Sequence, residues 1–231
     1  MRTVLRWVGR GALLALALLV LLQLWYLGWV LVYKWIDPGS TAFMDRELAA
    51  LQEKNPKARL KHQWVDYSRI SNHLKRAVIT AEDAKFNEHE GVDWDAIGKA
   101  YETNLKRGKQ AKGGSTITQQ LAKNLFLSPE KSYLRKGQEL LITFMIEGLW
   151  DKRRILEVYL NSVEWGVGVF GAEAAARHYY GVPASALNVE QAARLAGMLP
   201  RPKFFDRNRG SSYLAGRTQA ILRYINHAEV P

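Results

Sequence analysis

An apolar stretch near the start of the chain constrains its architecture more than any other feature. The residues from Gly11 to Tyr33 are apolar or aromatic, apart from Gln23. A helix that crosses a bilayer needs about 20 such residues, because its backbone can hydrogen-bond only within itself. A cleaved signal peptide usually has a shorter apolar core and ends in small residues, whereas this stretch ends in bulky aromatic residues. We therefore predict an uncleaved membrane-spanning signal anchor over residues 11–33, with a helix buried in a protein core as the alternative.

Charged and aromatic residues beside this stretch predict its orientation. Arg2, Arg6 and Arg10 precede it, and positively charged flanks stay in the cytoplasm. Tryptophan and tyrosine residues gather at its other end, where they suit the far membrane interface. We therefore expect residues 1–10 in the cytoplasm and the part of the chain after the anchor on the opposite side of the membrane.

The rest of the chain predicts helices rather than strands. Helix-capping residues precede apolar residues at helical spacing, and no segment alternates convincingly between apolar and polar residues. We expect helices to begin after Ser71, Asp93, Thr116, Ser132, Asp151 and Asn188. The chain has no cysteine, which excludes disulfides and thiol chemistry. The predicted fold class is mainly α, with residues 34–60 as a connector and residues 61–231 as one domain.

The helix that begins after Asp93 allows two interpretations of its first residues. Asp93 and Asp95 match the D-x-D pattern with which many sugar-nucleotide transferases hold a divalent metal. We interpret Asp93 as a helix cap instead, because an aspartate directly before an apolar helical stripe commonly caps that helix. We expect the apolar residues of this helix to face the core: Trp94, Ile97, Ala100 and Leu105.

The basic composition predicts an anionic partner. The chain has 33 lysine and arginine residues against 22 acidic residues, for a net charge of +11. Nucleic acid, membrane phospholipid and a phosphorylated substrate would each suit such a charge. A domain outside the cytoplasm meets little nucleic acid, so we expect a membrane or a phosphorylated substrate rather than nucleic acid.

A segment rich in glycine and hydroxyl groups organises the middle of the chain. From Gly113 to Asn124 it reads Gly-Gly-Ser-Thr-Ile-Thr-Gln-Gln-Leu-Ala-Lys-Asn. Thr116 and Gln119 have the spacing of a capping box, which predicts a helix start directly after the glycines. Free N–H groups at a helix start suit an anionic ligand, and Lys123 adds a positive charge. A glycine-rich turn before an ordinary capped helix is the alternative interpretation.

Three further motifs flank this segment. Residues 82–91 read E-D-x-x-F-x-x-H-x-G, residues 135–139 read R-K-x-x-E, and residues 152–161 read K-x-x-I-L-E-x-Y-L-N. In this order and spacing, the motifs between about residues 80 and 161 resemble those of the bacterial monofunctional biosynthetic peptidoglycan glycosyltransferases (transglycosylases). The resemblance implies a lysozyme-like α-helical domain with a smaller membrane-proximal lobe, preceded by one transmembrane helix.

The resemblance also implies a reaction and a location. The enzyme would polymerise glycan chains from lipid II, a disaccharide-peptide carried on a polyprenyl diphosphate. The reaction would invert the anomeric centre, form β-1,4 links and release polyprenyl diphosphate. The protein would be a single-pass protein of the bacterial cytoplasmic (inner) membrane, with its catalytic domain in the periplasm.

The family resemblance assigns roles to individual residues. Glu82 would be the general base that deprotonates the 4-hydroxyl of the acceptor sugar. Glu139 would be the second glutamate, which either orients neighbouring cations or meets the donor directly. Polar and cationic residues would bind the donor: Ser115, Gln120, Lys123, Lys131, Arg135 and Lys136. Many family members have arginine where this chain has Lys131, and lysine lacks the two-pronged geometry of arginine.

We expect no required cofactor and no metal bound by the protein, with a divalent cation (Mg²⁺ or Mn²⁺) near the diphosphate as an alternative. The expected partners are lipid II, the nascent glycan chain, the membrane, and other cell-wall synthesis or division proteins. A membrane-anchored peptidoglycan hydrolase is a rival function, since two carboxylates would serve hydrolysis as well. A non-enzymatic module that binds anionic lipid is another. The cationic residues between Glu82 and Glu139 favour the transferase, because hydrolysis of a neutral glycosidic bond does not need them.

Overall fold

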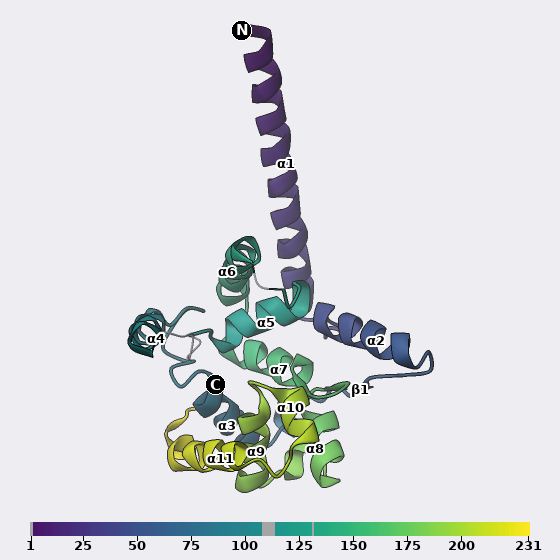
Figure 1. Ribbon diagram of the computed structural model, residues 1–231, viewed down its shortest axis with the longest axis vertical. Coiled ribbons are helices and arrows are strands. Elements are labelled where there is room, and N and C mark those ends of the chain that lie inside the picture. Colours follow the sequence, from purple (N-terminus) through teal and green to yellow (C-terminus); the bar gives the residue numbers. More distant parts are fainter. Residues whose placement is uncertain (1, 108–113, 131) are drawn as a thin grey trace. The chain divides into compact units, whose positions relative to one another are not determined.

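The computed structural model describes residues 2–107, 114–130 and 132–231 (Figure 1). It divides into two compact units, Met1–Asp37 and Pro38–Pro231. The described chain is mainly α-helical, with few and very short strands. This confirms the predicted fold class, a lysozyme-like helical domain preceded by one apolar helix.

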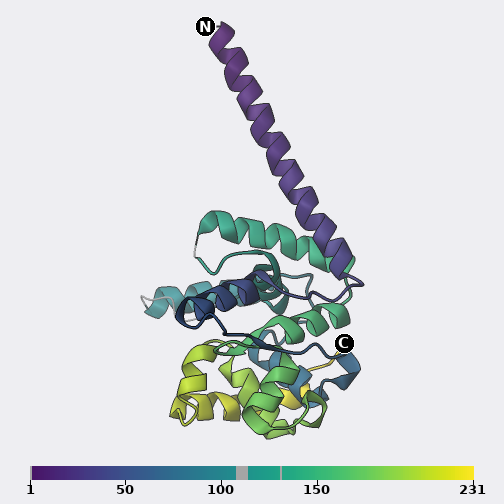
Figure 2. The same cartoon turned by 90° about the vertical axis from the view of Figure 1, so that its right-hand side faces the viewer.

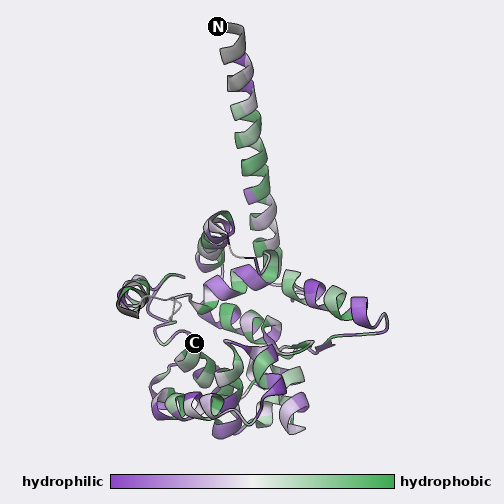
Figure 3. Ribbon diagram, viewed as in Figure 1, coloured by the Kyte–Doolittle hydropathy of each residue, from purple (hydrophilic) through white to green (hydrophobic). Residues whose placement is uncertain are grey.

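The first unit contains one long helix, α1 (Arg2–Tyr33). Its part from Gly9 to Tyr33 is long and apolar enough to cross a membrane. Figure 3 shows hydrophobic colouring along the middle of this helix. Many of its leucine side chains are exposed, so burial in a protein core does not explain their apolar character. The helix is therefore compatible with the predicted membrane anchor.

The second unit contains two groups of packed helices (Figure 1 and Figure 2). In one group, α3 (Asn72–Glu82) packs against α9 (Val189–Met198) and α11 (Ser212–Tyr224). In the other group, α5 (Ile117–Phe126) packs against α2 (Ala42–Lys54), α6 (Tyr133–Leu149) and α7 (Lys152–Ser162). The other helical elements are α4 (Trp94–Arg107), α8 (Ala172–Tyr180), α10 (Pro202–Arg207) and the 3-10 turns η1 (Tyr67–Arg69), η2 (Ala184–Ala186) and η3 (Ile225–His227). Helix α2 lies within the segment expected as a connector.

The predicted capping residues stand at the helix starts. Thr116 and Gln119 form a complete capping box at α5, in which each side chain accepts a hydrogen bond from the backbone of the other. Asn188 and Gln191 do the same at α9. The side chains of four other predicted caps accept hydrogen bonds from nearby backbone N–H groups: Ser71, Asp93, Ser132 and Asp151. These hydrogen bonds confirm the predicted caps. The sequence could predict them because capping depends only on residues that are neighbours in sequence.

A small sheet joins segments that are far apart in the chain. Strands β1 (Lys61–His62), β2 (Glu164–Gly166) and β3 (Val169–Phe170) lie in the order β1-β3-β2. Strand β3 is parallel to β1 and antiparallel to β2. Strands this short cannot show an alternating pattern, which is why the sequence did not predict them.

Asn161, the last residue of the fourth motif, has a structural role beside this sheet. It is fully buried. Its Oδ1 accepts a hydrogen bond from the backbone N–H of Val65 at 3.0 Å, and its Nδ2 donates to the carbonyl oxygen of Val65 at 3.0 Å. The side chain therefore replaces a strand partner for the segment that follows β1, and holds that segment against α7.

One prediction about α4 is wrong. Trp94, Ile97 and Leu105, which we expected to face the core, are 67%, 36% and 64% exposed. Ala100 is buried as predicted. Helical spacing shows which residues share a face, but another element has to cover that face before its side chains become buried.

Candidate functional site

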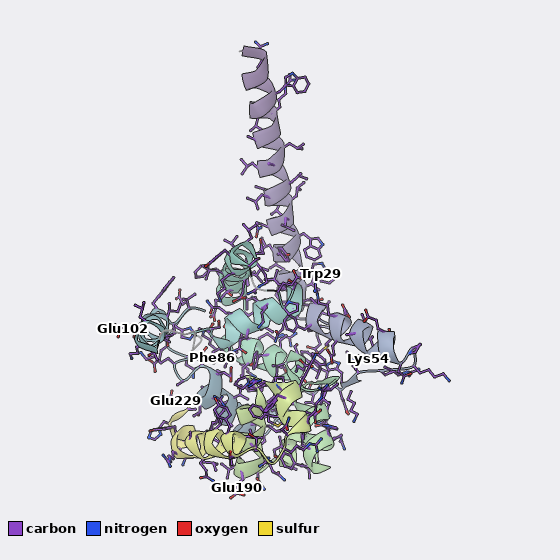
Figure 4. The ribbon with its side chains drawn as sticks, in the orientation of Figure 1. Trp29, Lys54, Phe86, Glu102, Glu190 and Glu229 are labelled. Carbon is purple, nitrogen blue, oxygen red and sulfur yellow. The ribbon has the colours of Figure 1, made fainter. Side chains whose placement is uncertain are left out.

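Glu82 lies where the two helix groups meet. It is the last residue of α3, and its side chain is 11% exposed. Gln120 of α5 donates a hydrogen bond from Nε2 to Oε2 of Glu82 at 2.8 Å. Nη2 of Arg217, from α11, lies 3.8 Å from Oε1 of Glu82. Phe86 of the same motif is fully buried in the interior (Figure 4). The carboxylate is thus sheltered, but solvent still reaches it.

The surroundings of Glu82 change its acidity. Burial raises the pKa of the Glu82 carboxyl above its ordinary value, and the negative charge of Asp83 adds to the rise. The hydrogen bond from Gln120 and the charges of Arg217 and Lys123 act against this rise in pKa. The loss of hydration has the largest effect on this pKa, because the charged carboxylate depends on water more than the neutral carboxyl does. A carboxylate with a raised pKa is a stronger proton acceptor, as a general base near neutral pH requires.

Asp83, the other acid of the motif, serves the fold. It is buried, and its Oδ2 accepts a hydrogen bond from the backbone N–H of Ile117 at 3.0 Å. Its Oδ1 lies 2.8 Å from Nε2 of His89. Two acids at the C-terminal end of α3 are unfavourable for that helix, but Asp83 faces the positive N-terminal end of α5. His89 and Asp83 therefore hold the first motif against the glycine-rich segment.

A cavity of about 550 Å³ opens between α5 and α6, next to Gln120. Six predicted site residues line it: Ser115, Gln120, Lys123, Arg135, Lys136 and Glu139. Ser132 and Tyr133 line it as well. Three of these side chains are cationic and one is a carboxylate, so the lining is positive overall and suits an anionic group. The structure therefore brings six predicted residues together, with Glu82 joined to them through Gln120, whereas Lys131 lies outside the described residues.

Glu139 is the buried carboxylate of this cavity. It is 3% exposed and accepts hydrogen bonds from Nη1 of Arg135 and Nζ of Lys136. Lys136 Nζ also donates to Oγ of Ser115 at 3.4 Å. Glu139 thus orients the two cations toward the cavity. Of the two roles that the sequence left open for Glu139, this geometry supports the orientation of neighbouring cations.

Lys123 lies within electrostatic reach of both glutamates. Burial lowers the pKa of its ammonium group, whereas the charges of Glu139 and Glu82 act to raise it. Its Nζ lies 5.4 Å from the centre of the Phe43 ring. Within the part of the chain that the structure describes, no carboxylate forms an ion pair with Lys123. Its charge is therefore available to an anionic ligand in the cavity.

The sequence did not predict two residues that contact this site. Tyr159 of α7 donates a hydrogen bond from its hydroxyl to Oε1 of Gln120 at 3.0 Å. Its place in the fourth motif suggested only packing. Arg217 had no sequence signal, because it stands in the last helix and far from any motif. Only the packing of α11 against α3 brings Arg217 to Glu82.

The D-x-D pattern acts as a cap. Asp93 Oδ1 accepts a hydrogen bond from the backbone N–H of Ala96 at 2.8 Å, while Asp95 pairs with Lys85 at 3.1 Å. In residues 2–107, 114–130 and 132–231, no group of three or more His, Cys, Asp and Glu side chains could hold a metal ion. The cations that the described part of the cavity offers to an anionic group are Lys123, Arg135 and Lys136.

Comparison with known proteins identifies the class to which this fold and site belong. The family model described as transglycosylase matches residues 47–226. This range contains all four motifs and both helix groups, apart from the first residues of α2. The chain belongs to the transglycosylase family.

Similar proteins cover almost the whole chain. A biosynthetic peptidoglycan transglycosylase of Janthinobacterium sp. (strain Marseille) is 63% identical over 219 residues, which is 93% of each chain. Proteins with the same description from Dechloromonas aromatica (strain RCB) and Azoarcus sp. (strain BH72) are each 58% identical, over 98% and 100% of both chains. The matching family model and these similar proteins show that the protein is a peptidoglycan glycosyltransferase.

Proposed function

We propose that the protein polymerises peptidoglycan glycan chains from lipid II, with Glu82 as the general base. Glu82 accepts the proton of the acceptor's 4-hydroxyl, and the oxygen attacks the anomeric carbon of the donor from the side opposite the diphosphate. The bond between that carbon and the diphosphate oxygen breaks, and polyprenyl diphosphate leaves with the bonding electron pair. The product is a β-1,4 link with inverted configuration, and Glu82 then releases its proton to solvent.

The cationic cavity supports a binding site for the diphosphate of the donor. Charge builds up on the diphosphate as its bond to the sugar breaks, and preorganised cations stabilise that charge. Lys123, Arg135 and Lys136 supply such cations, and Ser115 supplies a hydroxyl. We place the donor diphosphate in this cavity. We keep Lys131 as a further phosphate contact on the strength of its motif position alone.

One observation carries the proposal above its rivals. Gln120 lines the cationic cavity and also donates a hydrogen bond to Glu82, so a proton acceptor and an anion-binding site share one side chain. A hydrolase acting on a neutral glycan would need the carboxylates but not the cations. A module that binds anionic lipid would need the cations but not a sheltered carboxylate with a raised pKa.

We further propose that α1 anchors the protein in the bacterial cytoplasmic (inner) membrane, with the catalytic domain in the periplasm. The apolar helix and the arginines that precede it support this orientation. Lipid II and the nascent glycan chain are then presented at the same membrane face. Other cell-wall synthesis or division proteins stay as expected partners, to be tested by co-purification from crosslinked cells.

This proposal requires no cofactor, because the protein's own cationic side chains neutralise the diphosphate. A divalent cation (Mg²⁺ or Mn²⁺) would act on the diphosphate. Assaying polymerisation in the presence of EDTA, with and without added Mg²⁺ or Mn²⁺, tests this point directly.

The test of the main proposal uses purified full-length protein with labelled lipid II in detergent, and separates the products by size. We expect long glycan that lysozyme digests from the unmutated protein, and none from Glu82→Gln. Glu102→Gln is the matched control, because Glu102 is exposed on α4 (Figure 4). Unchanged lipid II together with cleavage of preformed peptidoglycan would favour the hydrolase. Activity on neither substrate would favour the binding module.

A further inference from the structure

Tyr159 places a hydroxyl group deep in the protein, directly behind the site. The residue belongs to α7 and is fully buried. Its hydroxyl donates to Oε1 of Gln120 at 3.0 Å. A buried tyrosine hydroxyl needs a hydrogen-bond partner, and this partner is the amide that also contacts Glu82.

The hydrogen bond from Tyr159 decides which end of the Gln120 amide faces Glu82. A glutamine amide has an acceptor oxygen at one end and a donor NH₂ group at the other. With its oxygen held by a hydroxyl donor, Gln120 presents Nε2 to Oε2 of Glu82, at 2.8 Å. The reverse orientation would set the amide oxygen against the carboxylate, which is favourable only when the carboxyl is protonated.

Tyr159 keeps its hydroxyl proton, and so remains able to donate, throughout the working pH range. Burial raises the pKa of its hydroxyl well above the ordinary value, and the charges of Glu82 and Asp83 add to this rise in pKa. The hydroxyl therefore stays protonated. In the structure, Tyr159 donates to Gln120 and Gln120 donates to Glu82, so both hydrogen bonds run in the same direction.

The other oxygen of Glu82 faces a second fixed group. Arg217 donates from Nε to the carbonyl oxygen of Gly197 at 3.1 Å, which anchors the guanidinium to α9. Its Nη2 lies 3.8 Å from Oε1 of Glu82. Three helices thus present groups to this carboxyl: Gln120 and Lys123 from α5, Arg217 from α11 and Tyr159 from α7, with Asp83 next to it in sequence.

We propose that Tyr159 is a positioning residue that acts through Gln120: its hydroxyl orients the amide so that the NH₂ group faces Glu82 and holds it as an oriented carboxylate. This inference rests on the proposed role of Glu82 as the general base. It gives Gln120 a duty toward the base in addition to its place in the cationic cavity.

Tyr159→Phe tests the inference, because it removes only the hydroxyl. Gln120 can then turn its oxygen toward Glu82, which favours the protonated carboxyl. We expect the acidic limb of the pH profile of kcat/KM to move to higher pH. On that limb the rate should fall by roughly ten-fold, while the plateau at higher pH changes little. Tyr179→Phe is the matched control, because it removes a hydroxyl that donates to the carbonyl oxygen of Trp165 at 2.9 Å, outside the site.

A double variant separates positioning from a general loss of structure. If Tyr159 acts through Gln120, then Gln120→Ala with Tyr159→Phe should have the same pH profile as Gln120→Ala alone. Additive losses in the double variant would overturn the inference. So would a uniform fall in rate at all pH values in Tyr159→Phe, which indicates altered packing only.

A titration without substrate separates this inference from the proposed function. In protein labelled with ¹³C at glutamate carboxyl carbons, the Glu82 signal is assigned by its loss in Glu82→Gln. We expect that signal to titrate at higher pH in Tyr159→Phe than in the unmutated protein and in Tyr179→Phe. An unmoved titration would overturn the positioning role even in an active enzyme. If the titration of Glu82 shifts as expected but the unmutated protein makes no glycan, the positioning role stands and the proposed function is contradicted.

Discussion

Oδ2 of Asp83 accepts a hydrogen bond from the backbone N–H of Ile117 at 3.0 Å, which ties the residue after α3 to the first turn of α5. Glu82 precedes Asp83 directly, and Gln120 lies one turn further along α5. This contact therefore helps to hold the proposed base within hydrogen-bond distance of the Gln120 amide.

Asp83→Asn should weaken this connection. The amide keeps an oxygen but loses the charge that favours the N-terminal end of α5, and it disturbs the contact with His89. We expect a loss of about 1–3 kcal/mol in the free energy of unfolding. Denaturant unfolding measures it, with Asp95→Asn as the control, since Asp95 pairs with Lys85 on the exposed surface, where solvent screens the interaction. Equal losses in both variants would contradict the structural role of Asp83.

Glu82→Gln should make the protein more stable at neutral pH. The pKa of Glu82 is raised in the folded state by burial, so the folded protein binds this proton more tightly than the unfolded chain. Stability from this group is present at low pH and is lost as the pH rises through the folded-state pKa. The gain in melting temperature should therefore grow from acidic to neutral pH. A gain in melting temperature that is equal at acidic and neutral pH would show that the charge of buried Glu82 does not destabilise the protein.

Lys123→Ala should impair use of the diphosphate donor. Removal of one preorganised charge from a transition state commonly costs on the order of 100-fold in rate, and we expect a loss of that size in kcat/KM for lipid II. Lys123→Arg should retain more activity because it keeps the charge. Lys54→Ala, at the exposed end of α2 (Figure 4), is the control and should keep full activity. Similar rates for Lys123→Ala and the unmutated protein would exclude Lys123 from the donor site.

Gly91→Ala should destabilise the loop that closes the first motif. Gly91 has a φ of +84°, and an added Cβ would lie 2.7 Å from Cγ2 of Thr143. We expect a loss of about 1–3 kcal/mol in the free energy of unfolding. Gly98→Ala in α4, where an added Cβ meets nothing within 4 Å, should instead stabilise the protein by up to about 1 kcal/mol. Thermal unfolding of the two variants compares them directly, and a neutral Gly91→Ala would contradict the geometry.

The sequence alone was sufficient for features that depend on near neighbours. The apolar character of residues 11–33, the capping boxes at Thr116 and Asn188, and the mainly α class follow from interactions within a few residues. The motif order also predicted the family and six residues of one cavity. Their roles in the reaction stay predictions.

The tertiary structure determined which distant segments and side chains contact one another. Tyr159 is 39 residues from Gln120 in sequence, and Gln120 is 38 residues from Glu82, so no local pattern reports their contacts. The same holds for Arg217, for the strands of two or three residues, and for Trp94, which stays exposed although its apolar character suggested burial. Side-chain spacing shows which residues share a face of a helix. Only the packing of whole helices determines which faces meet, because burial and long-range hydrogen bonds form between segments that the sequence keeps apart.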